Sequence, residues 1–351
     1  MKITPNIKKA IFKAVVISLS AAVLVFLVAL PFKEAQFLML SAAYSKSKDT
    51  AAKLSAYDKF VKLHPYYIPA RLKLARLYVL LDYANPNEPK NYESAVEQYE
   101  VILKLDAKNK DALSDLGDLY SGKKKFEDAD KLFKKLIKYY PKSPGYHHKL
   151  ALNYLRQDIN DKALEEITLT LSLDPENGGA HLLKGMLLEK QENMPDAIAE
   201  YETALRIFKE RKLAAYEIDA QANLGRAYFK AGLIFDSLQQ FEKIVRMNPN
   251  MIQGYLELAS AYYNINLVDK CISTLEALLK LRNAVPDAYR MLGFAYLKKA
   301  DYIAALSYFK KAEAYGIRFE AGFIDKVDEA AKAQREKPKQ EQPKENEPGK
   351  K

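Results

Sequence analysis

A chain of 351 residues is too long for one small core, and its length alone suggests two or three domains. Half of the residues are hydrophobic (49%) and glycine and proline are few, which favours a folded helical protein over a disordered one. The formal net charge is +10, but lysines alternate with acidic residues throughout, which favours a solvated surface and argues against a nucleic-acid partner. The single cysteine, Cys271, excludes an internal disulfide framework and a cysteine-based zinc site.

The first apolar segment lies at residues 10–31, after a short basic stretch at residues 1–9. Apart from Lys13 and two serines it is apolar up to residue 30, and about 21 helical residues would span roughly 31 Å, the thickness of a bilayer's hydrocarbon core. We therefore expect a transmembrane helix that acts as a signal anchor. The alternative is a cleaved signal peptide, but the apolar stretch is long and residues 29–32 offer no clean cleavage site.

The lysines around this segment predict its orientation. Lys2, Lys8 and Lys9 precede it and Lys13 lies in its first turn, whereas Lys33, beside Glu34, is the only close cation after it. The positive-inside rule then keeps residues 1–9 in the cytoplasm and places the rest of the chain outside it. In a bacterium, this predicts a single-pass protein of the inner membrane with a periplasmic body.

A repeated pattern follows. A small residue recurs with a tyrosine three positions later, as in DLGDLY at residues 115–120 and ELASAY at residues 257–262. The small positions are separated by 42, 34, 34, 40, 34 and 34 residues, and they are Ala75, Gly117, Ala151, Gly185, Gly225, Ala259 and Gly293. A second small residue, then a bulky one four positions later, and in several units a proline, recur in the same register.

This pattern resembles the tetratricopeptide repeat, a helix–turn–helix unit of 34 residues, over residues 34–319. The resemblance implies an all-α, right-handed solenoid of about eight units. We place these units approximately at residues 34–67, 68–109, 110–143, 144–177, 178–217, 218–251, 252–285 and 286–319.

The recurring residues have a packing explanation. We expect the small residues to lie where the two helices of a unit cross, and the tyrosines to fill the space between units. One helix pair cannot bury its own apolar side, so units must stack. Cys271 occupies one of the small positions, which favours a buried apolar role over a reactive thiol.

The two long intervals locate two insertions. The extra eight residues lie near residues 84–92, where Pro86 and Pro89 predict an extended loop. The extra six lie near residues 209–217, where no proline intervenes and a longer second helix is expected. Beyond the repeats, residues 320–335 predict a capping helix with Phe323 and Val327 inward, and residues 336–351 a disordered tail of Lys, Glu and Pro.

No catalytic, cofactor or metal site is expected. The four histidines lack metal-ligand spacing, and no phosphate-binding loop or hydrolase motif is present. Solenoids of this kind are chiefly binding surfaces, so we predict that the chain is not an enzyme.

The predicted binding surface is the concave wall formed by the first helix of each unit. The candidate groove residues there combine apolar and cationic side chains. They are Lys149, Leu152, Arg156, Leu183, Met186, Asn223, Arg226, Lys230, Tyr263, Arg290 and Phe294, with Leu155, Leu182, Leu256 and Met291 beside them. Such a groove suits an extended or amphipathic segment of a partner protein.

The sequence thus predicts a membrane-tethered scaffold that binds partner proteins in cell-envelope assembly, secretion or complex maturation. Two alternatives stay open: binding of peptidoglycan or another envelope polysaccharide, and service as an accessory subunit of an envelope enzyme. The open ends of a solenoid also allow self-association.

Overall fold

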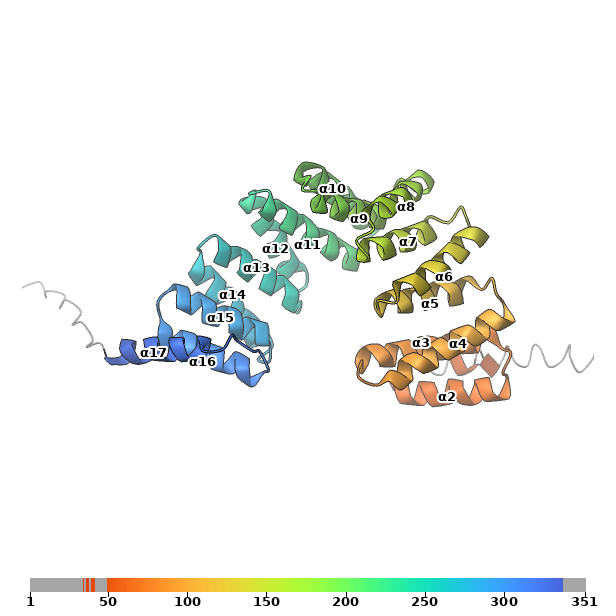
Figure 1. The fold of residues 1–351 in the computed structure, drawn as a ribbon, viewed down its shortest axis with the longest axis horizontal. Helices are drawn as coiled ribbons and strands as arrows, with labels where there is room; N and C mark the ends of the chain where they lie inside the picture. The colour runs from red at the N-terminus through yellow and green to blue at the C-terminus, as the bar shows by residue number, and fades with distance from the viewer. Residues whose placement is uncertain (1–33, 35, 38, 42–48, 337–351) are drawn as a thin grey trace, which may run out of the picture. The chain divides into compact units, whose positions relative to one another are not determined.

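The structure is a computed structural model that describes residues 34, 36, 37, 39–41 and 49–336. Sixteen helices, α2 to α17, lie between Thr50 and Glu336, and they make up all the regular secondary structure of that stretch (Figure 1). The predicted all-helical class is confirmed for this part of the chain. Two compact parts are distinguished, Met1–Ile159 and Asn160–Lys351, and each is described by itself.

The helices of both parts follow one another with short turns. Those of the N-terminal part are α2 (Thr50–Leu63), α3 (Ile68–Ala84), α4 (Pro89–Leu105), α5 (Lys110–Gly122), α6 (Phe126–Tyr139) and α7 (Pro144–Arg156). Those of the C-terminal part are α8 (Asn160–Leu173), α9 (Gly178–Lys190), α10 (Met194–Glu210), α11 (Ala214–Lys230), α12 (Ile234–Met247), α13 (Ile252–Asn264), α14 (Val268–Leu281), α15 (Pro286–Lys298), α16 (Tyr302–Ala314) and α17 (Phe323–Glu336). Within each part, consecutive helices pack against each other.

Two predicted segments fall outside the described residues. These are the membrane segment at residues 10–31 and the tail from residue 337 onward. Across the stretch that is described, no helix has both the length and the apolar character needed to cross a bilayer. The transmembrane helix therefore stays a prediction.

Asparagine caps and prolines mark where several helices begin. The Asn109 side chain accepts a hydrogen bond from the backbone N–H of Ala112 at 3.0 Å, and Asn177 does the same at the start of α9. Prolines occupy the first turn of α4, α7 and α15, where a missing N–H costs nothing because no carbonyl precedes it in the helix. Asparagine and proline residues thus mark the N-termini of these helices in the sequence.

Aromatic rings fill the space beside the recurring glycines. A Cβ atom added at Gly117 in α5 would lie 2.5 Å from a ring carbon of Phe133 in α6, and one at Gly185 in α9 would lie 2.5 Å from the ring of Tyr201 in α10. Both distances are far below van der Waals contact, so these positions exclude a side chain. The glycines therefore admit an aromatic ring between the helices, whereas we expected a close approach of two backbones.

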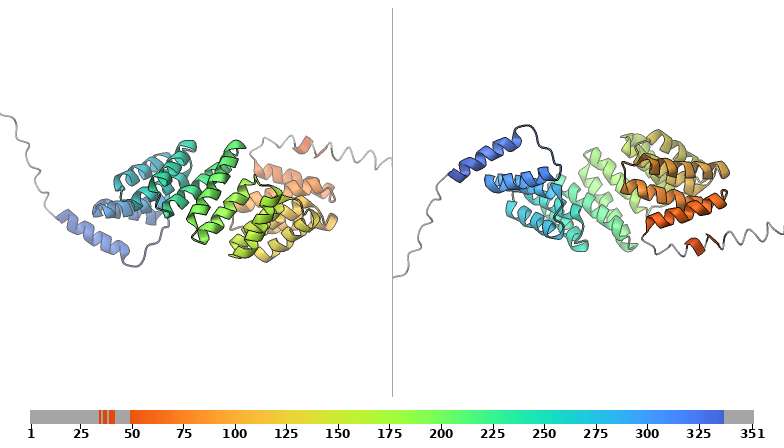
Figure 2. Two further views of the ribbon diagram at one scale, coloured as in Figure 1. Left: turned by 90° about the horizontal axis from the view of Figure 1, so that it is seen from above. Right: turned by 90° about the horizontal axis from the view of Figure 1, so that it is seen from below.

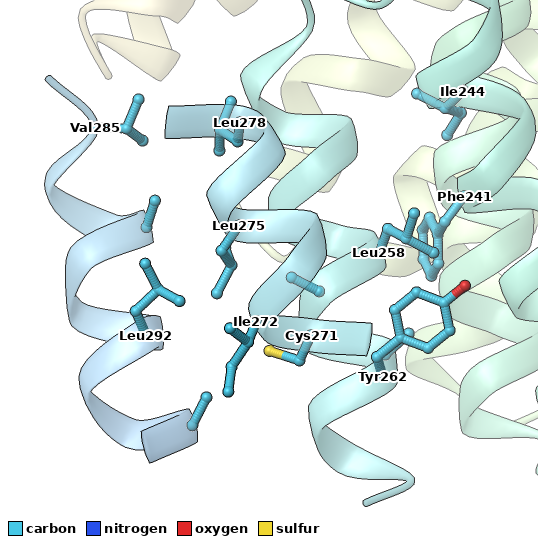
Figure 3. Packing of buried hydrophobic residues seen from close by; sticks show 14 residues of the cluster. Phe241, Ile244, Leu258, Tyr262, Cys271, Ile272, Leu275, Leu278, Val285 and Leu292 are labelled. Carbon is cyan, nitrogen blue, oxygen red and sulfur yellow. The ribbon is translucent and has the colours of Figure 1, made fainter. Parts of the chain in front are cut away.

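The largest core cluster of the C-terminal part joins α12 to α15 (Figure 3). Phe241 and Leu258 lie on one side of it, and Leu275 and Leu292 on the other, each less than a tenth exposed. The sulfur of Cys271 lies within this apolar cluster, and burial raises the pKa of its thiol to about 11. The cysteine is accordingly placed as a small apolar core residue.

A left-handed residue closes the turn inside each of six repeat units. It comes seven residues after the small position, and only one of the six is a glycine, Gly232. The φ angles range from 57° to 77°, at Lys124, Asp158, Glu192, Gly232, Asn266 and Ala300. Non-glycine residues are disfavoured in this region, so the turn geometry is imposed by the packing of the two helices that it joins.

The first insertion lengthens helices and does not form the predicted loop at residues 84–92. Helix α3 runs to Ala84 and α4 begins at Pro89, so both helices have 17 residues and the connection is short. The prediction was wrong because Pro89 occupies the first position of a helix, where proline is favoured.

The second insertion is also shared between two helices. Helix α10 ends at Glu210, a turn follows in which Lys212 has a φ of 54°, and α11 begins at Ala214, ahead of the predicted unit boundary at residue 217. The expected single long helix is therefore wrong beyond Glu210. Tyr216 of α11 stacks on Phe208 of α10 with ring centroids 5.4 Å apart, which stabilises the added turns.

Helix α17 packs on α16 at the end of the described chain (Figure 2). Val327 and Ala331 are buried against Leu306 and Phe309. The side chain of Gln334 accepts a hydrogen bond at 2.7 Å from the backbone N–H of Tyr302 and so caps the start of α16. The apolar end of the last repeat is thereby covered.

Candidate functional site

The first helices α9, α11, α13 and α15 of the C-terminal part carry one set of partly exposed side chains in register. We call this set the first-helix surface. Its members are Met186, Glu189, Asn223, Arg226, Lys230, Glu257, Ser260, Tyr263, Asn264, Arg290, Phe294 and Lys298. These side chains lie between three residues before and five residues after the small positions Gly185, Gly225, Ala259 and Gly293, which is why the repeat places them together.

Ion pairs join neighbouring first helices on this surface. Arg226 of α11 donates to Glu257 of α13 at 2.9 Å, and to the side-chain oxygen of Asn223 at 2.7 Å. Lys230 of α11 donates to Glu189 of α9 at 2.6 Å. The cations predicted to border the groove are therefore largely neutralised by acidic neighbours, which we did not predict.

A small hollow opens beside these ion pairs. It has a volume of about 180 Å³ and lies between α11 and α13. Arg226, Lys230 and Glu257 form its charged side, and Phe229 and Ala261 contribute apolar surface. Such a hollow offers both hydrogen-bonding groups and an apolar wall to one side chain of a ligand.

A larger hollow of about 360 Å³ lies where α15 meets the loop before α17. Phe294, Phe319 and Phe323 form its apolar wall, with Phe319 and Phe323 stacked at a centroid distance of 5.5 Å. Its charged lining residues are Arg290, Arg318 and Glu320, so the cations outnumber the one carboxylate. Arg290 is paired with Asp287 at 2.7 Å, while Arg318 makes no ion pair with the rest of the described chain. This combination suits an apolar side chain beside a carboxylate.

The N-terminal part carries a more polar version of the same surface. Arg76 of α3 donates to Asp115 of α5 at 2.6 Å and to Asp111 at 3.2 Å. Lys149 of α7 pairs with Asp118 of α5 at 2.5 Å. A hollow of about 520 Å³ beside Arg76 is lined by Lys53, Tyr57 and Leu80, among others. Here too, charges of adjacent first helices pair with one another.

The predicted groove residues divide into three groups. Leu183 and Leu155 are only 4% and 5% exposed, so placing them on the groove was wrong. Leu182, Leu256 and Met291 are partly buried and pack against core clusters of the C-terminal part. Lys149, Leu152 and Arg156 lie on α7 in the N-terminal part, where Arg156 donates to the Ser121 hydroxyl at 2.9 Å. The structure brings the remaining residues together on the first-helix surface, and they are Met186, Asn223, Arg226, Lys230, Tyr263, Arg290 and Phe294.

Several residues of the surface are not predicted by the sequence pattern. Glu189 and Glu257 are absent from the predicted groove because it includes no acidic position, although both occur on the same helices as predicted residues. Arg318 and Phe319 come after the last helix of the final repeat and Phe323 lies beyond that repeat, so the recurring positions of the register cannot place them. The sequence assigns Phe323 to the inner side of the capping helix, and the hollow uses that same side chain.

Tyrosines of the repeat reach from one unit to the preceding one. Tyr262 of α13 donates to Glu242 of α12 at 2.9 Å, and Tyr228 of α11 donates to Glu202 of α10. Burial and the Glu242 carboxylate together raise the pKa of Tyr262 to about 12. In both pairs the acceptor directly follows the bulky residue of the preceding second helix, so the contact is part of how units stack.

Comparison with known proteins agrees with this architecture. Two models of the tetratricopeptide repeat match, one over residues 88–152 and one over residues 148–211. The chain contains tetratricopeptide repeats. Together the two matches cover less than half of the sequence, and the helix pairs outside them continue the same repeat register. No protein of curated function matches the chain significantly.

Solved structures of this fold are similar as well. PilF of Pseudomonas aeruginosa is 19% identical with a TM-score of 0.51, over 63% of this chain and 96% of that one. PilW, described as a widely conserved type IV pilus biogenesis factor, is 17% identical with a TM-score of 0.51, over 58% and 92%. A chain of the APC/C hetero-tetramer Cut9–Hcn1 is 14% identical with a TM-score of 0.51, over 75% and 52%. At these identities the likeness concerns the fold alone, and the fold is a scaffold that typically mediates interaction between proteins.

Proposed function

We propose that this tetratricopeptide-repeat protein is a membrane-tethered scaffold whose first-helix surface binds an extended segment of a partner protein. The observation that carries the proposal is the pair of hollows along α11 to α15, each with apolar walls and charged rims. Two such hollows on the same run of helices suit two side chains of one extended segment. The hollow of Phe294, Phe319 and Phe323 would accept an apolar side chain, and Arg290 and Arg318 a carboxylate close to it.

The ion pairs of the surface support binding of a protein segment over a small molecule. Arg226–Glu257 and Lys230–Glu189 are only partly buried, so a ligand can exchange its own carboxylates or amines with them at little cost. The first-helix surface presents both positive and negative side chains, which favours a partner of mixed charge over an anionic polysaccharide.

Co-purification from crosslinked membranes tests this proposal. Tagged full-length protein should recover a partner in stoichiometric amount, and the Arg290→Glu/Arg318→Glu variant should recover at least about tenfold less, because two charges at the rim change sign. Lys280→Glu in α14, an exposed cation away from the hollow, is the matched control and should recover as much as the wild type. Equal recovery by all three proteins, or recovery of glycan without a stoichiometric protein, would contradict the proposal.

The membrane tether and the envelope location are part of the same proposal. They rest on the apolar residues 10–31 and on the lysines that precede them. A C-terminal alkaline phosphatase fusion should be active, and the protein should stay in the membrane fraction after alkaline carbonate extraction. An inactive fusion would contradict the orientation, and release by carbonate would contradict the anchor. Likeness at the level of fold does not select one envelope pathway, so pilus assembly, secretion and complex maturation stay equivalent here.

A further inference from the structure

A separate hollow of about 740 Å³ lies among the helices α10, α11 and α12 of the C-terminal part. We call it the second-helix cavity. Four cationic side chains line it: Arg206 and Lys209 of α10, and Lys243 and Arg246 of α12. The cavity also contains Glu202 and Glu210, so its lining carries a net charge of +2. It shares no lining residue with the two hollows of the first-helix surface.

Both lining carboxylates already have partners inside the protein. Glu210 is held by Arg206 at 3.0 Å, and Arg206 also donates to Glu176 at 3.1 Å. Glu202 accepts the hydroxyl hydrogen of Tyr228. Arg206 is thus neutralised, and the cationic excess of the cavity belongs to the remaining three side chains.

Those three cations are poorly compensated. Lys209 and Arg246 make no ion pair with any residue in the described part of the chain, and the nearest carboxylate oxygen to Lys243, on Glu217, is 3.9 Å away. Burial and the facing ammonium group of Lys209 hold the pKa of Lys243 below its usual value, and Arg246 adds to this effect. An anion placed among the three groups would relieve a repulsion that the protein itself leaves in place.

The second insertion of the repeat contributes to this cavity. Helix α10 has 17 residues, whereas the second helices α6, α12 and α14 have 14, and the additional residues at its end include Lys209 and Glu210. The added first turn of α11 carries Glu217. The longer repeat interval near residues 209–217 therefore supplies charged residues in and beside the second-helix cavity.

We propose that the second-helix cavity binds a small, soluble, phosphate-bearing anion with at least two negative charges. A volume of about 740 Å³ fits a small-molecule ligand, because such sites usually enclose 300–1,000 Å³. Lysine and arginine together supply point charges and a planar donor group for phosphate oxygens. Gln239 and Gln240 add amide groups for the uncharged portion of the ligand. The cations line a concavity, which favours a compact ligand over the flat surface of a bilayer.

Equilibrium dialysis with inorganic pyrophosphate tests this assignment on the full chain. The wild type should bind pyrophosphate saturably with about one site, and the affinity should fall as salt concentration rises. Lys209→Gln/Lys243→Gln should weaken binding at least about tenfold, and Arg246→Gln about threefold or more, because each removes a charged donor. Lys135→Gln is the matched control: Lys135 follows Phe133 of α6 by two residues, as Lys243 follows Phe241 of α12, and it lies outside the cavity. Circular dichroism and thermal unfolding establish that each variant is folded.

The results separate the proposal from its alternatives. Saturable binding that is lost in the double variant and kept in the control supports it. Absence of saturable binding up to millimolar pyrophosphate overturns it, as does equal weakening by Lys135→Gln, which would indicate only a basic surface. If soluble pyrophosphate does not bind but phosphatidylcholine vesicles containing phosphatidic acid do so in a manner that depends on Lys209 and Lys243, the ligand is a lipid and the assignment is overturned. The Lys209→Gln/Lys243→Gln variant should recover as much partner protein as the wild type. A failure of the pyrophosphate proposal can therefore be told apart from a failure of the partner-binding proposal.

Discussion

Replacing Gly117 by alanine tests how the two helices of a repeat unit pack. The new Cβ would lie 2.5 Å from one ring carbon of Phe133 and 2.9 Å from another, so the ring must move by roughly 1 Å to restore ordinary contact. Phe133 is 1% exposed and has no free space to move into. Overpacking of this kind costs about 1–3 kcal/mol, and the better helix propensity of alanine returns about 1 kcal/mol. We expect a net destabilisation of up to about 2 kcal/mol.

A compensating change should restore most of this loss. The equivalent positions in α13 and α14 are Ala259 and Leu275, both fully buried, so the fold accommodates an alanine when the ring is absent. Gly117→Ala/Phe133→Leu should therefore be more stable than the sum of the single variants by at least about 1 kcal/mol.

Urea denaturation followed by circular dichroism measures these free energies, and hydrogen exchange of α5 and α6 localises them. Gly145→Ala in α7 is the matched control, because no atom outside its own stretch of helix lies within 4 Å of the place that a Cβ would take, and alanine there should be neutral or stabilising by up to about 1 kcal/mol. If Gly117→Ala is as well tolerated as Gly145→Ala, or if the two changes are additive, the packing argument is refuted.

Three further predictions concern buried polar and thiol groups. Lys123→Met should lower the free energy of unfolding by about 3 kcal/mol in urea titrations. Asp82 is 1% exposed and pairs with Lys123 at 2.8 Å, so the substitution leaves it as an uncompensated buried charge. An unchanged urea midpoint would contradict this prediction. Between pH 10 and pH 12 the free energy of unfolding of the wild type should fall as pH rises, because the pKa of Tyr262 is about 12 in the folded protein and near 10 in the unfolded chain. The free energy of unfolding of Tyr262→Phe should fall less over the same range, which denaturation at a series of pH values checks. Cys271, with its pKa raised to about 11 by burial, should react slowly with a thiol reagent at pH 8 and fully in urea; rapid labelling of the native protein would show that the site is open.

The repeat register predicted the helix pairs and their buried positions because packing imposes those residues directly. A small residue opposite a bulky one, as at Gly117 and Phe133, recurs where the two helices of a unit cross. The left-handed turn residue was not predictable, since Lys124 and Ala300 share its backbone geometry but no side-chain property. There the surrounding helices determine the conformation, and the sequence records little of it.

The binding surface was predictable only in outline. A helix register places Met186 and Arg226 on the same side of their helices, and both lie on the first-helix surface. Which charges pair depends on how adjacent helices are aligned, and this alignment brings Glu257 to Arg226 over 31 residues of sequence. Leu183 was misplaced because it holds the same register position as Asn223 and Glu257, which are partly exposed, so the register alone does not show that Leu183 is buried.

Site-specific photo-crosslinking in cells that express the full chain tests most directly whether the first-helix surface binds a partner protein. A photoreactive residue at Ser260, which lines the 180 Å³ hollow of the first-helix surface, is compared with one at Ser273, an exposed serine of the second helix α14. If the first-helix surface binds a partner segment, position 260 should give one discrete protein adduct and position 273 none. Adducts of equal yield from both positions, or an adduct from position 273 alone, would contradict it.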